Sequence, residues 1–298
     1  MRVANAPCSW GVLEFDHTAK PFPPEQVLDE IAATGYAGSE LGEWGFFSTD
    51  PNQLHDAFAA RGLTLIGAFV PVALLSPCGQ GDGVALALRT ARLLRVAGAE
   101  PPLIILSDAT AADRTRRAKA GRIGLSDNLS PAEWNRVAGL AEHIARAVWT
   151  ESGLRTVFHH HCATHVEAPW EIDAVMQRVS PDLLGLCLDT GHATYGGGDP
   201  LALLARYGDR VWHVHFKDCS APVAARARSE EWDYVKAVRH GLFCELGRGV
   251  VDFPAVLDRL RCRGYDGWIV VEQDVVPSTG TPAASAERNR LFLGSLGV

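Results

Sequence analysis

Three consecutive histidines, His159, His160 and His161, follow a short apolar run in the stretch TVFHHHCATH. Histidine is the most common metal ligand among side chains, and its charge changes near neutral pH. A run of this kind is typical of a metal site or of acid-base chemistry, provided that other polar side chains reach the same place. The rest of the sequence therefore decides what the run means.

Polar residues of the same kinds end several other apolar runs. Taken singly, each has an ordinary explanation, since a lone Asp can cap a helix and a lone His can be a buried structural residue. Together they form a set that is hard to explain structurally. Its members are Glu40 and Glu43 in AGSELGE, Asp189 and His192 in CLDTGH, His213, His215 and Lys217 in VWHVHFKD, and Glu272 in WIVVEQD.

The elements that carry these residues alternate regularly between short apolar strands and amphipathic helices. Strands are predicted at residues 3–10, 37–42, 63–71, 102–108, 155–161, 184–192, 211–218 and 268–275. Helical patterns include residues 23–35, 86–98, 131–153 and 252–264. Nearly continuous apolar strands are typical of a parallel sheet that is buried on both faces. Eight such units predict an α/β fold with a single (β/α)₈ TIM barrel, forming one domain over residues 1–298.

In such a barrel the carboxyl ends of all strands meet at one mouth, where catalysis takes place. Because strand side chains alternate, His213, His215 and Lys217 share one face. By the same rule His159 and His161 point one way, and His160 points toward the surrounding helices. Two long connections, residues 109–129 and 219–250, leave the carboxyl ends of strands and are expected to border the mouth.

A carboxylate such as Glu272 after a fully apolar strand needs a partner, because an isolated buried charge is very costly. A divalent cation can be that partner. Mixed imidazole and carboxylate ligands suit Mn²⁺, Co²⁺, Fe²⁺ or Zn²⁺ better than Ca²⁺, whose sites contain only oxygen ligands. The seven scattered cysteines form no C-x-x-C pair, and none is at a position that demands zinc, so they read as reduced thiols.

The composition of the chain disfavours some classes of binding partner. The chain is 47% hydrophobic and 21% charged, with a net charge of −7. An acidic balance without long basic runs disfavours nucleic acid and anionic membranes. No secretory leader and no apolar stretch of membrane-spanning length is found, so we expect a cytoplasmic protein that acts on a small polyol or keto-sugar, and a homo-oligomer is compatible with the sequence.

Several motifs resemble those of the xylose isomerase-like TIM barrel superfamily. They are CLDTGHATYGGGDP, VWHVHFKD, ELGRGVVDFPAVLDRL and GYDGWIVVEQD, which together span most of the second half of the chain. With HHHCATHVE and NAPCSWGV added, the chain is most similar to the inosose dehydratases within that superfamily. Residues 70–130 contribute no motif to this resemblance.

The resemblance implies a metal set of Asp189, His215 and Glu272. The superfamily's fourth ligand is a Glu, and its position falls here on His159, with His161 as the alternative. The implied metal is Mn²⁺ or Co²⁺, with Zn²⁺, Fe²⁺ and Mg²⁺ as alternatives, and the dehydratases are also associated with glutathione. Loss of the Glu disfavours the two-carboxylate chemistry of the related ketose epimerases.

The resemblance therefore favours a hydro-lyase that converts 2-keto-myo-inositol into a trihydroxycyclohexane dione and water. The acid-base candidates are His161, His192 and Lys217, and the candidates for substrate binding are Glu40, Glu245 and Arg248. A metal-dependent ketose epimerase or sugar isomerase on the same barrel is the alternative. An endonuclease IV-like enzyme is disfavoured by the acidic charge. A non-catalytic sugar-binding protein is disfavoured because it does not explain the convergent histidines.

Overall fold

The computed structural model describes residues 1–13, 22–76, 79–110, 113–275 and 281–298. Eight parallel strands close into a barrel in the order β1-β10-β7-β6-β5-β4-β3-β2, as the sequence predicts. The barrel strands are β1 (Arg2–Asn5), β2 (Gly38–Glu40), β3 (Thr64–Val72), β4 (Leu103–Asp108), β5 (Thr156–His159), β6 (Leu184–Asp189), β7 (Val211–Phe216) and β10 (Trp268–Val271).

Most strands end earlier than the apolar pattern suggests. β5 ends at His159 and β10 at Val271, so His160, His161 and Glu272 lie just beyond the ladder. The register pairs His159 with Cys187 and Asp189 with His215. Adjacent strand ends thus bring residues from distant parts of the sequence to the same level of the barrel.

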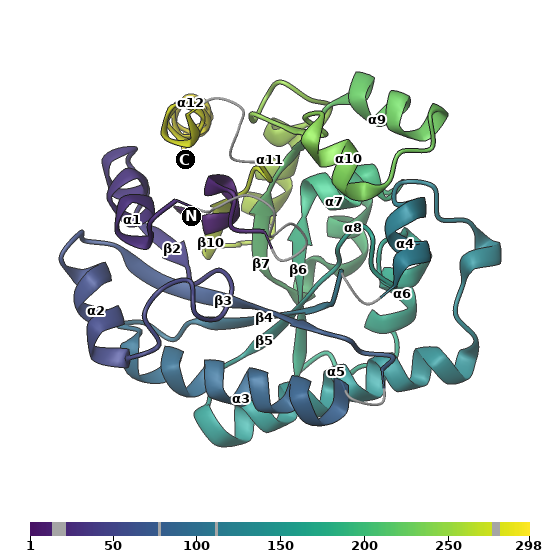
Figure 1. The fold of residues 1–298 in the computed structure, drawn as a ribbon, viewed down its shortest axis with the longest axis horizontal. Coiled ribbons are helices and arrows are strands. Elements are labelled where there is room, and N and C mark those ends of the chain that lie inside the picture. Colours follow the sequence, from purple (N-terminus) through teal and green to yellow (C-terminus); the bar gives the residue numbers. More distant parts are fainter. Residues whose placement is uncertain (14–21, 77–78, 111–112, 276–280) are drawn as a thin grey trace.

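Helices surround the barrel (Figure 1). They are α1 (Pro24–Ala33), α2 (Pro51–Ala59), α3 (Gly79–Ala97), α4 (Arg114–Lys119), α5 (Pro131–Ser152), α6 (Pro169–Met176), α7 (Thr190–Tyr195), α8 (Pro200–Tyr207), α9 (Ala221–Ser229), α10 (Tyr234–Arg239), α11 (Phe253–Cys262) and α12 (Pro282–Ser295). Short 3₁₀ turns cover Pro7–Trp10, Leu125–Asp127 and Gly208–Arg210.

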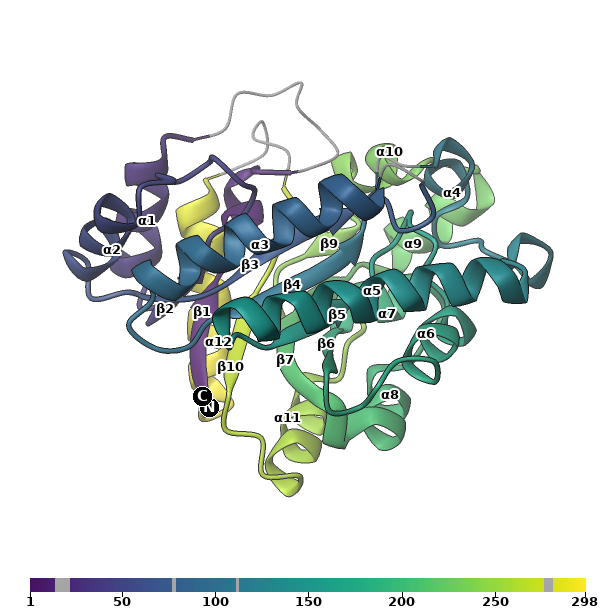
Figure 2. The same ribbon diagram turned by 90° about the horizontal axis from the view of Figure 1, so that it is seen from below.

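Local sequence explains where the longest helix lies. Ser130 and Glu133 form a capping box at the start of α5, Pro131 occupies its first turn, and Gly153 ends it in the left-handed conformation. Its inner face, which includes Trp134, Val137 and Ile144, is buried in the core. α3 and α5 run side by side in both views (Figures 1 and 2). None of the described helices is long and apolar enough to cross a membrane.

The two long connections meet over one side of the barrel mouth. The first carries α4, and the second carries α9, α10 and the small antiparallel pair β8 (Asp218–Cys219) and β9 (Phe243–Cys244). Arg122 donates to the carbonyls of Ala227 and Trp232, and Arg228 donates in return to the carbonyl of Gly121. α4 and α10 accordingly lie next to each other in both views (Figures 1 and 2).

Candidate active site

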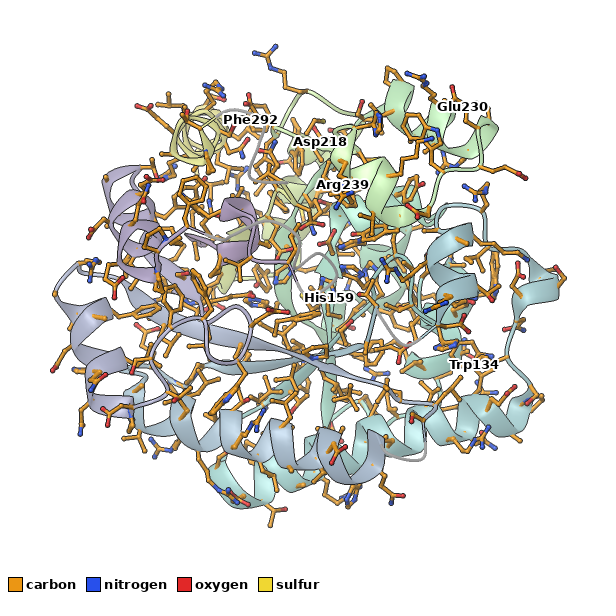
Figure 3. All side chains as sticks on the ribbon, in the orientation of Figure 1. Trp134, His159, Asp218, Glu230, Arg239 and Phe292 are labelled. Atoms are coloured by element: carbon orange, nitrogen blue, oxygen red, sulfur yellow. The ribbon has the colours of Figure 1, made fainter. Side chains whose placement is uncertain are left out.

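A cavity opens at the carboxyl ends of the strands. One wall is apolar and contains Phe69 and Val12, whereas the remainder is rich in carboxylates and imidazoles. The described lining residues are Ala6, Pro7, Cys8, Val12, Glu40, Gly42, Glu43, Phe69, His159, His161, Lys217, Glu272 and Asp274. His159 lies near the middle of the molecule, where the strands converge (Figure 3).

Glu40 fixes the orientation of His215 from across the barrel. Its Oε1 lies 2.8 Å from Nε2 of His215 and 2.8 Å from Nε2 of His213. Burial opposes ionisation of Glu40, but the two imidazoles outweigh burial and lower its pKa to about 2. A carboxylate that accepts from Nε2–H leaves the Nδ1 lone pair of His215 available for another partner. This carboxylate-histidine pairing is the arrangement that commonly supports a metal ligand.

Four side chains present buried atoms to one point below the cavity. His159, Asp189, His215 and Glu272 each offer one ligand atom, and these atoms all lie within 4.8 Å of one another. Nε2 of His159 is 3.5 Å from Oδ2 of Asp189, and Nδ1 of His215 is 3.3 Å from Oε1 of Glu272.

The hydrogen-bond pattern of this group fits a divalent cation. Oδ2 of Asp189, Nδ1 of His215 and both ring nitrogens of His159 are buried without a hydrogen-bond partner among the described residues. Buried polar atoms are rarely left unpaired. Burial raises the pKa of Asp189, yet Lys217 and His159 outweigh it and lower the pKa to about 2, so the carboxylate is ionised. Two carboxylates and two imidazoles could thus hold the metal.

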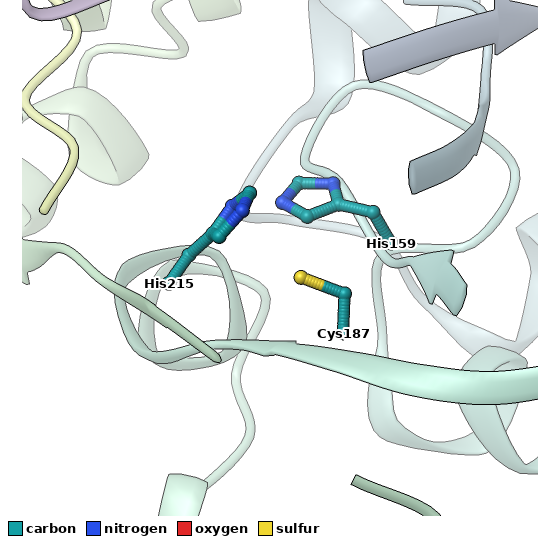
Figure 4. A group of neighbouring side chains, drawn as sticks. All are labelled: His159, Cys187 and His215. Carbon is teal, nitrogen blue, oxygen red and sulfur yellow. The ribbon is translucent and has the colours of Figure 1, made fainter. Parts of the chain in front are cut away.

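Cys187 was not expected near these ligands. Its Sγ lies close to His159 and His215, whose rings are tilted by 47° to each other with centroids 5.0 Å apart, and the three could form a softer metal set (Figure 4). Burial raises the pKa of the Cys187 thiol to about 12, so it is protonated at neutral pH. The carboxylate set offers one ligand atom more, and oxygen and imidazole ligands suit Mn²⁺ better than a thiolate does, so it is the better ligand group for that metal. Alternation along β6 from Asp189 could have located Cys187.

Lys217 is held by several acceptors. Its Nζ lies 3.0 Å from Nε2 of His192, 3.0 Å from Glu272 Oε2 and 3.1 and 3.2 Å from the two oxygens of Asp274. Burial lowers the pKa of Lys217, but Asp274, Glu272 and Asp189 raise it well above its usual value. The Glu272 oxygen that faces away from His215 is thus anchored by an ammonium group.

Asp274 is the site residue that sequence reasoning missed. It also accepts a hydrogen bond of 3.2 Å from the hydroxyl of Tyr234, on α10. Its position two residues after Glu272 in EQD was the available signal.

His161 lines the cavity, and a backbone carbonyl selects its tautomer. Nδ1 lies 2.7 Å from the carbonyl of Cys162, which can only accept, so Nδ1 carries the proton and Nε2 the lone pair. Burial, followed by His159 and Lys217, lowers the pKa of His161 well below its usual value. His192 packs behind it, with ring centroids 3.8 Å apart, and is not among the described lining residues. His161 is therefore a neutral imidazole in the cavity lining.

The prediction that His160 faces the helices is wrong. Its Nε2 accepts from the backbone N–H of Asp189 at 3.3 Å, and burial lowers its pKa to about 3. The physical reason is that β5 ends at His159, so strict alternation no longer applies to the next residue. His160 instead supports the backbone of a candidate ligand.

Glu245 and Arg248 are placed away from the described lining of the cavity. Glu245 forms an ion pair of 2.6 Å with Arg288 and accepts from Ser285, both on α12. Arg248 is exposed, and its backbone N–H donates to the carbonyl of Glu245. Glu40, in contrast, reaches the cavity but bonds to two imidazoles.

The family model that matches residues 28–295 is the xylose isomerase-like TIM barrel. The chain belongs to this family. It is 32% identical over 296 residues to an inosose dehydratase of Geobacillus kaustophilus strain HTA426, with 99% of this chain and 94% of that protein covered. It is also 32% identical to the rhizopine catabolism protein MocC of Rhizobium meliloti, with 96% and 86% covered.

Solved structures agree on the fold. The probable 3-DHS dehydratase AsbF of Bacillus anthracis superposes with a TM-score of 0.72 at 14% identity, covering 99% of both chains. An L-ribulose 3-epimerase superposes with a TM-score of 0.71 at 18% identity, covering 99% of this chain and 94% of the other. Family membership and the curated relatives identify this xylose isomerase-like barrel as an enzyme, a hydro-lyase similar to inosose dehydratases.

Proposed function

We propose that this enzyme is a metal-dependent dehydratase that converts 2-keto-myo-inositol into a trihydroxycyclohexane dione and water. The observation that carries the proposal is the placement of His161 beside the four-residue set of His159, Asp189, His215 and Glu272. The curated relatives named inosose dehydratase support the substrate class.

Dehydration of a cyclic ketone with neighbouring hydroxyls has two physical requirements. A proton next to the carbonyl must be removed, and the hydroxyl one carbon further must leave with a proton. Mn²⁺ or Co²⁺ at the four-residue set would supply Lewis-acid stabilisation of negative charge on the carbonyl oxygen. The side chains of the cavity would carry out the proton transfers.

His161 is proposed as the base. Its Nε2 carries the lone pair because Nδ1–H donates to the carbonyl of Cys162. Its lowered pKa keeps the imidazole neutral near pH 7. Once protonated at Nε2, the same ring can return the proton to the leaving hydroxyl if both events occur on one face of the substrate.

Glu40 and Lys217 act as positioning residues in this scheme. Glu40 holds the ring of His215, and Lys217 anchors the outer oxygen of Glu272. Lys217 is also an acid-base candidate from the sequence, but its ammonium already faces His192, Glu272 and Asp274. The ring of Phe69 stands edge-on to His159 with centroids 5.8 Å apart, and it provides an apolar surface for the C–H face of the substrate ring.

The alternative function, epimerisation or isomerisation of a ketose, requires acid-base groups on both faces of the substrate. His159 replaces one carboxylate expected for that chemistry, and Glu272 is engaged by Lys217. Mass spectrometry separates the two. Incubation of the enzyme with 2-keto-myo-inositol and Mn²⁺, with and without glutathione, is expected to give a product lighter by one water. An isomer of unchanged mass would support the alternative, and an unreacted substrate would refute both assignments.

A further inference from the structure

The charges around the cavity are uneven. Four carboxylates belong to its described lining, namely Glu40, Glu43, Glu272 and Asp274, whereas Lys217 is the single Lys or Arg in that lining. Among side chains, a Lys or Arg with unused hydrogen-bond donors holds a substrate carboxylate or phosphate most strongly. The availability of the Lys217 ammonium therefore decides whether such a substrate can be held by the described residues.

The ammonium of Lys217 has three N–H donors, and each has an acceptor within the protein. Glu272 takes one of them at 3.0 Å, and the two oxygens of Asp274 take the other two at 3.1 and 3.2 Å. Lys217 is 1% exposed, so it cannot turn toward another partner without breaking one of these contacts.

Asp274 differs from Glu272, the other carboxylate that binds this ammonium, because it does not belong to the four-residue set. Glu272 belongs to that set, and His192 packs against His161. Asp274 is itself 4% exposed and is held in place by the hydroxyl of Tyr234 at 3.2 Å. Tyr234, on α10 in the second long connection, thus fixes the carboxylate that binds the Lys217 ammonium.

We propose that Asp274 is a specificity-determining residue that excludes anionic substrates from this cavity by occupying the Lys217 ammonium and adding a negative charge to the wall. The cavity accordingly selects neutral cyclic polyols over ring compounds of similar size that carry a carboxylate or phosphate. This inference rests on the proposed function only in treating the cavity as the substrate site.

Quinate and quinamide provide matched probes, because the two share ring and shape and differ by one charge. Binding of each to the chelator-treated parent protein and to chelator-treated Asp274→Asn is measured by isothermal titration calorimetry, because quinate, an α-hydroxy acid, would itself coordinate Mn²⁺. In the parent we expect quinate to bind at least about tenfold more weakly than quinamide, since one unpaired charge near a surface costs more than 1.4 kcal/mol. Asp274→Asn is expected to strengthen quinate binding by at least about tenfold relative to quinamide.

Glu43→Gln is the control, because it removes one charge from the same lining without changing the carboxylates around Lys217. It is expected to change the preference by less than about threefold. Asp274→Ser serves as a second variant that also releases Lys217 if the Asn variant fails to fold, as judged by circular dichroism.

Two results would overturn the inference. One is a parent protein that binds quinate as tightly as quinamide. The other is a folded Asp274 variant that gains no quinate affinity, including the case in which quinate binding stays undetectable. Neither result depends on turnover of 2-keto-myo-inositol, so failure of the inference and failure of the proposed dehydratase activity are separately visible.

Discussion

Glu40→Gln tests how the four-residue set is held. Oε1 of Glu40 accepts from Nε2 of both His213 and His215 at 2.8 Å, and the pair of charge-assisted bonds keeps the Nδ1 lone pair of His215 directed toward Asp189 and Glu272. Gln has nearly the same shape and keeps one acceptor oxygen. The substitution therefore removes the charge while leaving the packing unchanged.

The magnitude follows from the bonds involved. A hydrogen bond to a charged group contributes about 1.5–3 kcal/mol, against about 0.5–1.5 kcal/mol for a neutral one. The bond to His215 alone thus loses about 1–2 kcal/mol, and ring misorientation adds to this. We expect metal affinity to fall by about 10–100-fold, as is usual when the outer partner of a ligating histidine is removed.

Competition between the protein and a fluorescent chelator for Mn²⁺ measures the effect. Glu43→Gln, which removes the same charge from another point of the cavity lining, is expected to change the affinity by less than threefold, about the scale of one exposed charge pair. Unchanged Mn²⁺ affinity in Glu40→Gln would show that His215 is not oriented by Glu40 or is not a ligand.

Three further predictions concern the support of the site. A Cβ at residue 191 would lie 2.6 Å from Cγ of Lys217, so Gly191→Ala should lower turnover at least about tenfold through overpacking. Gly139→Ala is the control, because a Cβ there meets nothing within 4 Å, and it should leave turnover unchanged. Equal activity of both variants would contradict the role of Lys217. Arg116 makes two buried hydrogen bonds of 2.8 and 2.6 Å to Glu171, so Arg116→Ala should cost about 3–5 kcal/mol of unfolding free energy in urea, and a loss below about 1 kcal/mol would argue against a buried ion pair. Burial lowers the pKa of His165, but its hydrogen bond to Asp108 at 2.8 Å and the charge of that carboxylate outweigh burial and raise it. Its stabilisation is fully present below the unfolded pKa of about 6.5 and is lost as pH rises through the folded pKa. The difference in unfolding free energy between the parent and His165→Gln should therefore shrink above that pH. A difference that grows as pH rises would contradict this role of His165.

Strand and helix positions could be predicted because they depend on local pattern. The apolar run at residues 63–71 and the helical pattern at residues 131–153 predict β3 and α5, and the structure confirms both. Strand ends were predicted less well. The ladder stops where the neighbouring strand stops, and that depends on register, which is a property of the closed barrel.

The same limit applies to the site. Alternation correctly placed His213, His215 and Lys217 together, because the first two belong to β7 and the third follows it directly. It failed for His160, which lies beyond the end of β5. The partners of Lys217 come from α7 and from the segment after β10, and only the closed barrel shows that Asp274 meets Lys217.

The most direct test of the account measures water loss from 2-keto-myo-inositol by one protein preparation in two states. The protein is first stripped of metal with a chelator, verified by elemental analysis, and then supplied with Mn²⁺. We predict no product above the uncatalysed rate in the stripped state and a product lighter by one water after Mn²⁺ is added. Full dehydration by the verified metal-free protein, or a product of unchanged mass after Mn²⁺ is restored, would contradict the account.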